Sequence, residues 1–123
     1  MPKISKDTIT ITDYGPVDDG QLEVDDWSIN FTTFKVDIDA TPMMKGLPGD
    51  HCNSPHWGYV FKGRITFRFE DHDEVVEAGD AFYVPGGHIP IAEAGTEYLQ
   101  FSPSDELQRT SEAIQRNMAA MRG

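Results

Sequence analysis

The sequence predicts an all-β domain, a β-sandwich or small barrel, that ends in one α-helix. Short segments in which apolar and polar residues alternate follow one another along most of the chain, separated by turns rich in glycine and proline. The C-terminal segment instead repeats apolar residues at steps of three to four, which is the spacing of a helix. Strands this short and this closely spaced are typical of sandwiches and small barrels.

The N-terminal third is predicted to contain two strands around an acidic loop. Residues 8–12 alternate cleanly and predict an edge strand, whereas residues 13–26 are acidic and broken by glycine turns, which predicts a loop. Residues 27–38 alternate again, but their apolar residues change register near Thr32-Thr33, which predicts a β-bulge. Residues 40–55 predict a loop that is long enough to be functional.

The second half predicts a meander of short strands followed by the helix. Residues 56–61 are apolar on both faces, so we expect a central strand that is covered on both sides. Further strands are predicted at 65–69, 75–77, 81–84, 88–92 and 97–101. The helix is predicted over 103–121 with Ser102 as its N-cap. Its apolar stripe, which we expect to lie against the barrel, consists of Leu107, Ile114, Met118 and Met121.

Length and charge limit the function classes. A chain of 123 residues is enough for one domain whose core needs no disulfide. Its formal net charge of -11 would repel nucleic acid and an anionic membrane surface. The chain has no apolar run that could span a bilayer, and its first residues lack the apolar core of a signal peptide. With its single cysteine, the sequence predicts an acidic cytoplasmic protein that binds neither nucleic acid nor membranes.

Three of the four histidines lie in two short blocks between Gly49 and His88. Imidazole is the commonest protein ligand for a first-row transition metal, so His51, His56 and His88 are the candidate metal ligands. Cys52 is an alternative to His51, because a thiolate binds zinc or iron strongly. The simpler interpretation is a set of hydrogen-bonded strand histidines beside an inert buried thiol.

The first of these blocks resembles the first motif of the cupin superfamily, which runs G, five residues, H-x-H, three or four residues, E, six residues, G. Gly63 matches the final glycine, which puts His56 at the position of the glutamate. His51 then matches the second histidine, while Gly49 stands in the place of the first, which is a departure from the motif.

The second block resembles the second cupin motif, which runs G, five residues, P-x-G, two residues, H. Gly79, Pro85 and Gly87 match in spacing, but Pro90 stands where the histidine is expected. The histidine is His88, and a shift of two residues keeps a side chain on the same face of a strand. We therefore expect His88 to point into the barrel.

The resemblance covers residues 49–102 well and implies a cupin-like double-stranded β-helix, that is, a jelly-roll barrel with one C-terminal helix. It implies a single domain over 1–123, with N-terminal strands and a loop in 1–48, the motif-bearing core in 49–102 and the helix in 103–121. It also implies a divalent transition metal, for which iron, zinc, manganese and nickel all accept imidazole ligands.

Two functions are compatible with such a site, because cupins include both enzymes and binding proteins. Three neutral imidazoles would leave the charge of the metal uncompensated, which favours an anionic ligand such as a carboxylate or an enolate. The first hypothesis is a metal-dependent oxygenase or isomerase that acts on a small anionic metabolite. The second is a non-catalytic cupin that binds or senses a small molecule. The sequence nominates no general acid or base, so whether the chain is an enzyme stays open.

The surroundings of the metal can also be predicted. Gly58 follows His56 on the same face and is expected to leave space for a small ligand, with Tyr83 and Tyr98 as further pocket residues. The doubly apolar strand at 57–61 and the isolated strand at 8–12 predict a homodimer.

Overall fold

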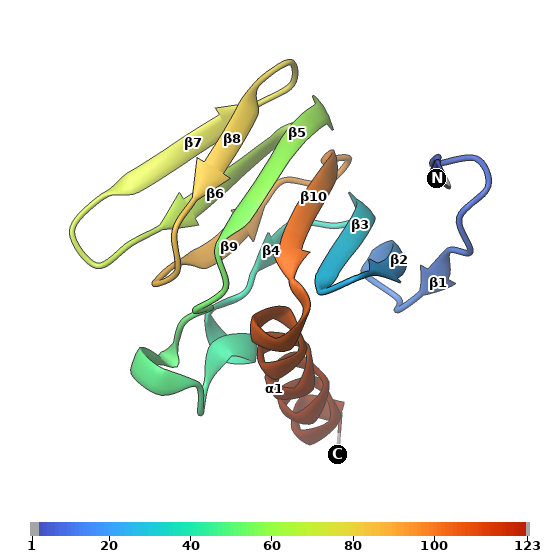
Figure 1. Ribbon diagram of the computed structural model, residues 1–123. Coiled ribbons are helices and arrows are strands. Elements are labelled where there is room, and N and C mark those ends of the chain that lie inside the picture. The colour runs from blue at the N-terminus through green and yellow to red at the C-terminus, as the bar shows by residue number, and fades with distance from the viewer. Residues whose placement is uncertain (1–2, 123) are drawn as a thin grey trace.

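Two antiparallel β-sheets face each other in the computed structural model, which describes residues 3–122 (Figure 1). In spatial order, the larger sheet consists of β1 (Thr12–Asp13), β2 (Val17–Val24), β3 (Trp27–Phe34), β10 (Glu97–Pro103), β5 (His56–Lys62) and β8 (Ala81–Val84). The smaller sheet consists of β4 (Ile38–Asp39), β9 (Ile89–Ala92), β6 (Arg64–Arg68) and β7 (Asp73–Glu77). This is the predicted jelly-roll barrel.

The hydrophobic core lies between the two sheets. Val60 and Val84 of the larger sheet pack against Ile65 and Phe67 of the smaller one, and each of the four is at most 1% exposed. Burying a side chain of this kind stabilises the fold by roughly 1.5–3 kcal/mol. On the larger sheet this core takes in β5, β8, the start of β10 and the end of β3, where Phe34 is buried.

The other half of the larger sheet turns its polar side chains inward and its aromatic ones outward. On β3, Ser28, Asn30 and Thr32 are buried, while Trp27 is 42% exposed. β3 pairs without interruption with both β2 and β10, so the bulge predicted near Thr32-Thr33 is wrong. That prediction assumed that apolar residues face the core, and on this strand only Phe34 does.

The N-terminal predictions also need correction. The segment predicted as an acidic loop contains β2, which forms a hairpin with β3 through a turn in which Asp25 has a φ of 56°. Residues 8–12 were predicted as an edge strand, but only a two-residue strand, β1, forms there. Ile9 and Ile11 instead lie over Gly20 on the outer face of β2.

β5 takes the predicted central place between β10 and β8, but only one of its faces is covered. His56 and Val60 on the inner face are buried, whereas Trp57, Tyr59 and Phe61 on the outer face are each about 40% exposed. The prediction of a strand covered on both sides is therefore wrong for the chain as described.

One end of the barrel is covered by the loop between β4 and β5 and by the C-terminal helix. The loop contains two 3₁₀ helices, η1 (Thr41–Met44) and η2 (Pro48–Asp50), and α1 (Ser104–Arg122) packs on η1 (Figure 1). The Asn117 side chain donates hydrogen bonds to the carbonyl oxygens of Met43 and Lys45, at 2.7 Å and 2.8 Å. Helix and loop are thus joined directly.

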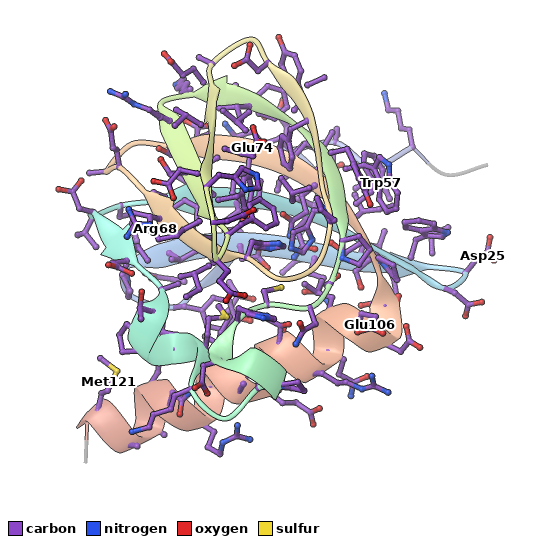
Figure 2. All side chains as sticks on the ribbon, turned by 90° about the vertical axis from the view of Figure 1, so that its left-hand side faces the viewer. Asp25, Trp57, Arg68, Glu74, Glu106 and Met121 are labelled. Carbon is purple, nitrogen blue, oxygen red and sulfur yellow. The ribbon has the colours of Figure 1, made fainter. Side chains whose placement is uncertain are left out.

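The helix differs from its prediction at both ends. It begins at Ser104, because β10 continues through Pro103, so Ser102 is a strand residue and not the N-cap. In the apolar stripe Leu107 is buried, but Met121 at the far end is 62% exposed (Figure 2). Within residues 3–122, no helix combines the length and the apolar character needed to cross a membrane.

The core predicts a clear difference between two apolar positions on one hairpin. We expect Ile65→Ala, which removes a fully buried side chain of β6, to lower the free energy of unfolding by about 2–5 kcal/mol. Val75→Ala on β7 is the control, because Val75 is 50% exposed, and its effect should stay within about 0.5 kcal/mol. Urea unfolding of both variants tests this, and equal effects would contradict the position of the core.

Candidate metal centre

A backbone bridge joins the two histidine-bearing segments. The amide of Cys52 donates to the carbonyl oxygen of His88 at 2.8 Å, and the amide of His88 donates back to Cys52 at 3.2 Å. The chain after η2 is thereby paired with the turn before β9. Gly86 permits this approach, because a Cβ atom there would collide with the backbone of Asn53. The bridge places the Cys52 thiol and the His88 ring side by side.

His56 reaches the same place from β5. It begins that strand on the inner face, pairs with Val84 of β8, and is 4% exposed. Its Nδ1 atom lies 2.7 Å from the Oγ atom of Ser102, on the inner face of neighbouring β10. This contact fixes the orientation of the ring, so that its Nε2 atom points toward Cys52.

Three potential ligand atoms meet at this end of the barrel. One from each of Cys52, His56 and His88 lies within 4.8 Å of the others, and all three residues are buried. The Sγ atom of Cys52 is 3.7 Å from the Nε2 atom of His56. The ring centroids of His56 and His88 are 5.0 Å apart. The cluster lies beneath α1, where the Oγ1 atom of Thr110 is 3.3 Å from the Cys52 sulfur.

The hydrogen bonds of His88 determine which of its nitrogens is free. Its Nδ1 atom lies 2.8 Å from the carbonyl oxygen of Pro85, which can only accept, so Nδ1 carries the proton. The lone pair is then on Nε2, which is buried and has no hydrogen-bond partner in the described part of the chain. A ring held by a carbonyl at one nitrogen and free at the other is the usual arrangement of a metal-binding histidine.

Burial keeps both imidazoles neutral at neutral pH. It lowers the pKa of His56 to about 3, and the proximity of His88 adds to this. It also lowers the pKa of His88 to about 4, against the opposing effect of the hydrogen bond to Pro85. Burial raises the pKa of the Cys52 thiol, which favours its protonated form. The thiol would have to release this proton in order to bind a cation, because the thiolate is the metal ligand.

His51 lies close to this group but outside it. Its Nδ1 atom is buried without a partner among residues 3–122. A positive charge on the His51 ring would lower the pKa of His88. Its Nε2 side lies against Gly49, where a Cβ atom would collide with the ring. The glycine that departs from the first cupin motif thus makes room for this histidine. His72 lies on the surface, where its ring pairs with Asp71 at 2.7 Å.

The three buried groups fit a transition-metal ion. Two ligands of one tetrahedral zinc ion lie roughly 3.5 Å apart, which is near the 3.7 Å between the sulfur and His56 Nε2. A cation would also satisfy the Nε2 atom of His88, whose unpaired burial costs on the order of 1–3 kcal/mol. Thiolate and imidazole together suit zinc or iron better than the oxygen-preferring magnesium and calcium ions.

The space expected beside Gly58 is filled. A side chain at this position would collide with the carbonyl oxygen of Leu99, and it would come within 2.6 Å of the Phe82 ring. Phe82 lies opposite Gly58 on β8, so its ring occupies the room that the glycine leaves. Gly58 therefore serves the packing of Phe82, and the prediction of empty space there is wrong.

The two tyrosines predicted to line the pocket lie on opposite faces of the larger sheet. Tyr83 points outward, is 54% exposed and packs on Trp57 with ring centroids 5.0 Å apart, so it does not face the barrel interior. Tyr98 points inward and is buried, and this burial raises the pKa of its phenol.

Sequence reasoning missed a row of polar side chains on the inner face of the sheet that carries His56. The Asp19 carboxylate accepts hydrogen bonds from Thr32 at 2.6 Å and from Asn30 at 2.9 Å, and burial raises its pKa. The Oδ1 atom of Asn30 is buried without a partner in the described chain. Gln100 lies opposite Asn30 on β10 and is also buried. In residues 28–32 polar residues alternate with apolar ones, and this pattern could have revealed the row if the polar side had been assigned to the interior.

Comparison with known families and structures agrees with this architecture. The model of the Cupin domain family matches residues 45–90, which include all four candidate ligands. A search of curated proteins finds no match.

Several solved structures share the fold. The polyketide cyclase RemF from Streptomyces resistomycificus is 15% identical with a TM-score of 0.62, over 85% of this chain and 80% of that one. An RmlC-like cupin from Shewanella frigidimarina is 18% identical with a TM-score of 0.56, over 81% and 88% of the two chains. KdgF from Halomonas sp. is 16% identical with a TM-score of 0.55, over 84% and 94%.

At these identities the solved structures establish the fold alone, and the family model adds the motif-bearing segment. The paired sheets, the helix across one end and the match over residues 45–90 lead to one conclusion. Residues 45–90 match the Cupin domain family, and the chain has the cupin fold.

Proposed function

We propose that this cupin binds one transition-metal ion through Cys52, His56 and His88 and uses it to bind a small anionic molecule. The observation that carries the proposal is the buried, unpartnered Nε2 atom of His88 beside a thiol and a second imidazole. Hydrogen bonds at the remote Nδ1 atoms of both rings support it, because they leave the Nε2 atoms available.

Cys52 is the better third ligand, because His51 lies outside the group of atoms within 4.8 Å. Its thiolate would cancel one charge of a divalent ion, and the remaining positive charge would attract a carboxylate or an enolate. The donor set favours zinc, with iron as the alternative. A bound metal would supply Lewis-acid polarisation of such a ligand.

The polar row on the inner face of the larger sheet supports a small-molecule role. Asn30 offers a buried acceptor, its Oδ1 atom, to a hydroxyl or N–H group. Asp19, whose pKa is raised by burial, lies beside it. A core that only had to be stable would gain more from apolar side chains, because polar groups are costly to bury. We propose that these residues contact the organic part of the ligand.

Within this function, an oxygenase or isomerase is the first candidate, and a neighbour such as the polyketide cyclase RemF gives a precedent for small-molecule chemistry on this fold. The second candidate is a cupin that binds or senses a small molecule without turnover. The burial of all three ligands favours it, since Cys52 is 2%, His56 4% and His88 0% exposed. Turnover of carboxylate substrates by the metal-loaded protein separates the two.

The ligand set can be tested with cobalt in place of the native metal. The wild-type chain should bind one Co²⁺ and show a near-ultraviolet sulfur-to-cobalt charge-transfer band, because Cys52 would be a ligand. Cys52→Ser should lose the band, and His88→Ala should bind cobalt much more weakly. His51→Ala should retain the band, and His72→Ala is the matched surface control. A band that survives in Cys52→Ser would contradict the proposed set.

Ser102 should affect metal affinity without touching the metal. Ser102→Ala removes the partner of His56 Nδ1, and loss of such a contact typically weakens binding about 10–100-fold. Competition with a chromophoric chelator measures this, with Ser111→Ala on the helix as the control. Unchanged affinity in Ser102→Ala would show that the serine does not orient the ligand.

The pKa values of the histidines predict how stability depends on pH without metal. In the unfolded chain both imidazoles titrate near 6.5, whereas in the fold their values are about 3 and about 4. Between these limits the unfolded chain binds more protons, so stability is fully present above pH 6.5 and decreases as the pH falls toward 4 and 3.

Urea unfolding between about pH 7 and about pH 5 tests this, because most carboxylates stay ionised in that window. A His56→Gln variant should lose less stability across the window than the wild type. Parallel pH profiles of the two proteins would contradict the assignment to this imidazole.

A further inference from the structure

One hydroxyl group lies among the buried apolar residues of α1. Leu107 and Ala113 are 8% and 1% exposed, and Thr110 lies between them in the chain and is 5% exposed. The three residues follow one another at steps of three, so they share one face of the helix. Because a hydroxyl is costly to bury without a hydrogen bond, a threonine at this position needs a partner.

The partner of this hydroxyl is the sulfur of Cys52. The Oγ1 atom of Thr110 lies 3.3 Å from the Sγ atom, and both residues are buried. While Cys52 is a thiol, either of the two atoms can donate. A thiolate has lost its proton and can only accept, so in that state the hydroxyl of Thr110 is the donor.

The other polar neighbours of the sulfur cannot take this role. The carbonyl oxygen of Ser54, 3.9 Å away, can only accept a hydrogen bond. The Nε2 atom of His56, 3.7 Å away, is the atom that the proposed function assigns to the metal. Thr110 is thus the hydrogen-bond donor that the described chain offers to a thiolate at Cys52.

Contacts on both sides of Thr110 fix the helix at this place. At its start, the amide of Ser104 donates at 2.9 Å to the carbonyl oxygen of Asp26, in the turn between β2 and β3. About two turns after Thr110, the Asn117 side chain donates to two carbonyl oxygens in the loop that contains η1. The position of the hydroxyl is therefore set by a whole helix and not by one flexible side chain.

We propose that Thr110 is a positioning residue of the metal centre, which donates a hydrogen bond to the Cys52 thiolate and limits the charge that the sulfur gives to the cation. This inference rests on the proposed function. Hydrogen bonds at a ligating sulfur and at other ligand atoms are a general means by which proteins adjust metal centres. The C-terminal helix is then part of the centre, although it supplies no ligand.

The hydrogen bond also has a consequence for the anionic molecule of the proposed function. A sulfur that shares its negative charge with a hydroxyl donates less of it to the cation, so more positive charge is left to attract a carboxylate or an enolate. Thr110 therefore strengthens anion binding without contacting the anion.

The cobalt form of the full-length chain tests the inference. Thr110→Val replaces the hydroxyl with a methyl group, and its sulfur-to-cobalt band should lie at a longer wavelength than that of the wild type, because a thiolate without the hydrogen bond gives up charge more easily. Thr110→Ser keeps the hydroxyl and should have the wild-type band. Ser111→Ala removes the neighbouring hydroxyl of the helix and is the matched control, whose band should not move.

Acetate gives a second measurement, because an anion that binds the cobalt ion changes its visible spectrum. Thr110→Val should bind acetate more weakly than the wild type and Thr110→Ser. Circular dichroism checks that each variant is folded, and Thr110→Ala is a second variant without the hydroxyl in case valine disturbs the packing.

The possible failures can be told apart. A band and an acetate affinity that stay at their wild-type values in Thr110→Val and Thr110→Ala would overturn the role of Thr110 and leave Cys52 as a ligand. An equal shift in Thr110→Ser and Thr110→Val would also overturn it, because the cause would be packing and not the hydroxyl. A wild-type protein without the band would contradict the proposed ligand set itself, and the inference with it.

Discussion

The site depends on one short piece of backbone pairing. The reciprocal hydrogen bonds between Cys52 and His88 join a loop to a turn that lies far from it along the chain. Without this bridge the thiol would belong to a loop that is not held beside the rings of His56 and His88. With it, main-chain hydrogen bonds hold the backbones of the two residues together, and the contact of His88 Nδ1 with Pro85 sets the direction of the ring. His56 completes the group from the start of β5, with its ring oriented by Ser102.

The second constraint is which side chains the strands of the larger sheet turn toward the interior of the barrel. Most two-sheet proteins bury the apolar side of each strand, but β3 and part of β10 bury Asn30, Thr32 and Gln100 and expose their aromatic neighbours. The barrel thereby obtains polar side chains on the inner face of the sheet that carries His56. The same alternation leaves aromatic side chains such as Trp27 and Phe101 exposed outside. The polar interior and the exposed aromatic side chains are thus two results of one pattern, because successive side chains of a strand point in opposite directions.

The sequence was most informative where apolar residues mark the buried face. The strands from β5 to β10 and the cupin fold follow from alternation, turn residues and the two motifs. β2 was missed, because Asp18, Asp19 and Gly20 are poor strand formers and only pairing with β3 makes them extended. The choice between His51 and Cys52 was open for a related reason. It depends on the bridge to His88, a long-range contact that no local pattern contains.

The partners of the ligands also come from outside the segment that carries the cupin motifs. The family match ends at residue 90, yet Ser102 on β10 orients His56, and Thr110 on α1 lies against the Cys52 sulfur. A fragment containing every candidate ligand would therefore lack Ser102 and Thr110, which contact two of them. Substitutions in the C-terminal segment alone could therefore change the metal affinity of such a centre, while the residues of the cupin motifs stay the same.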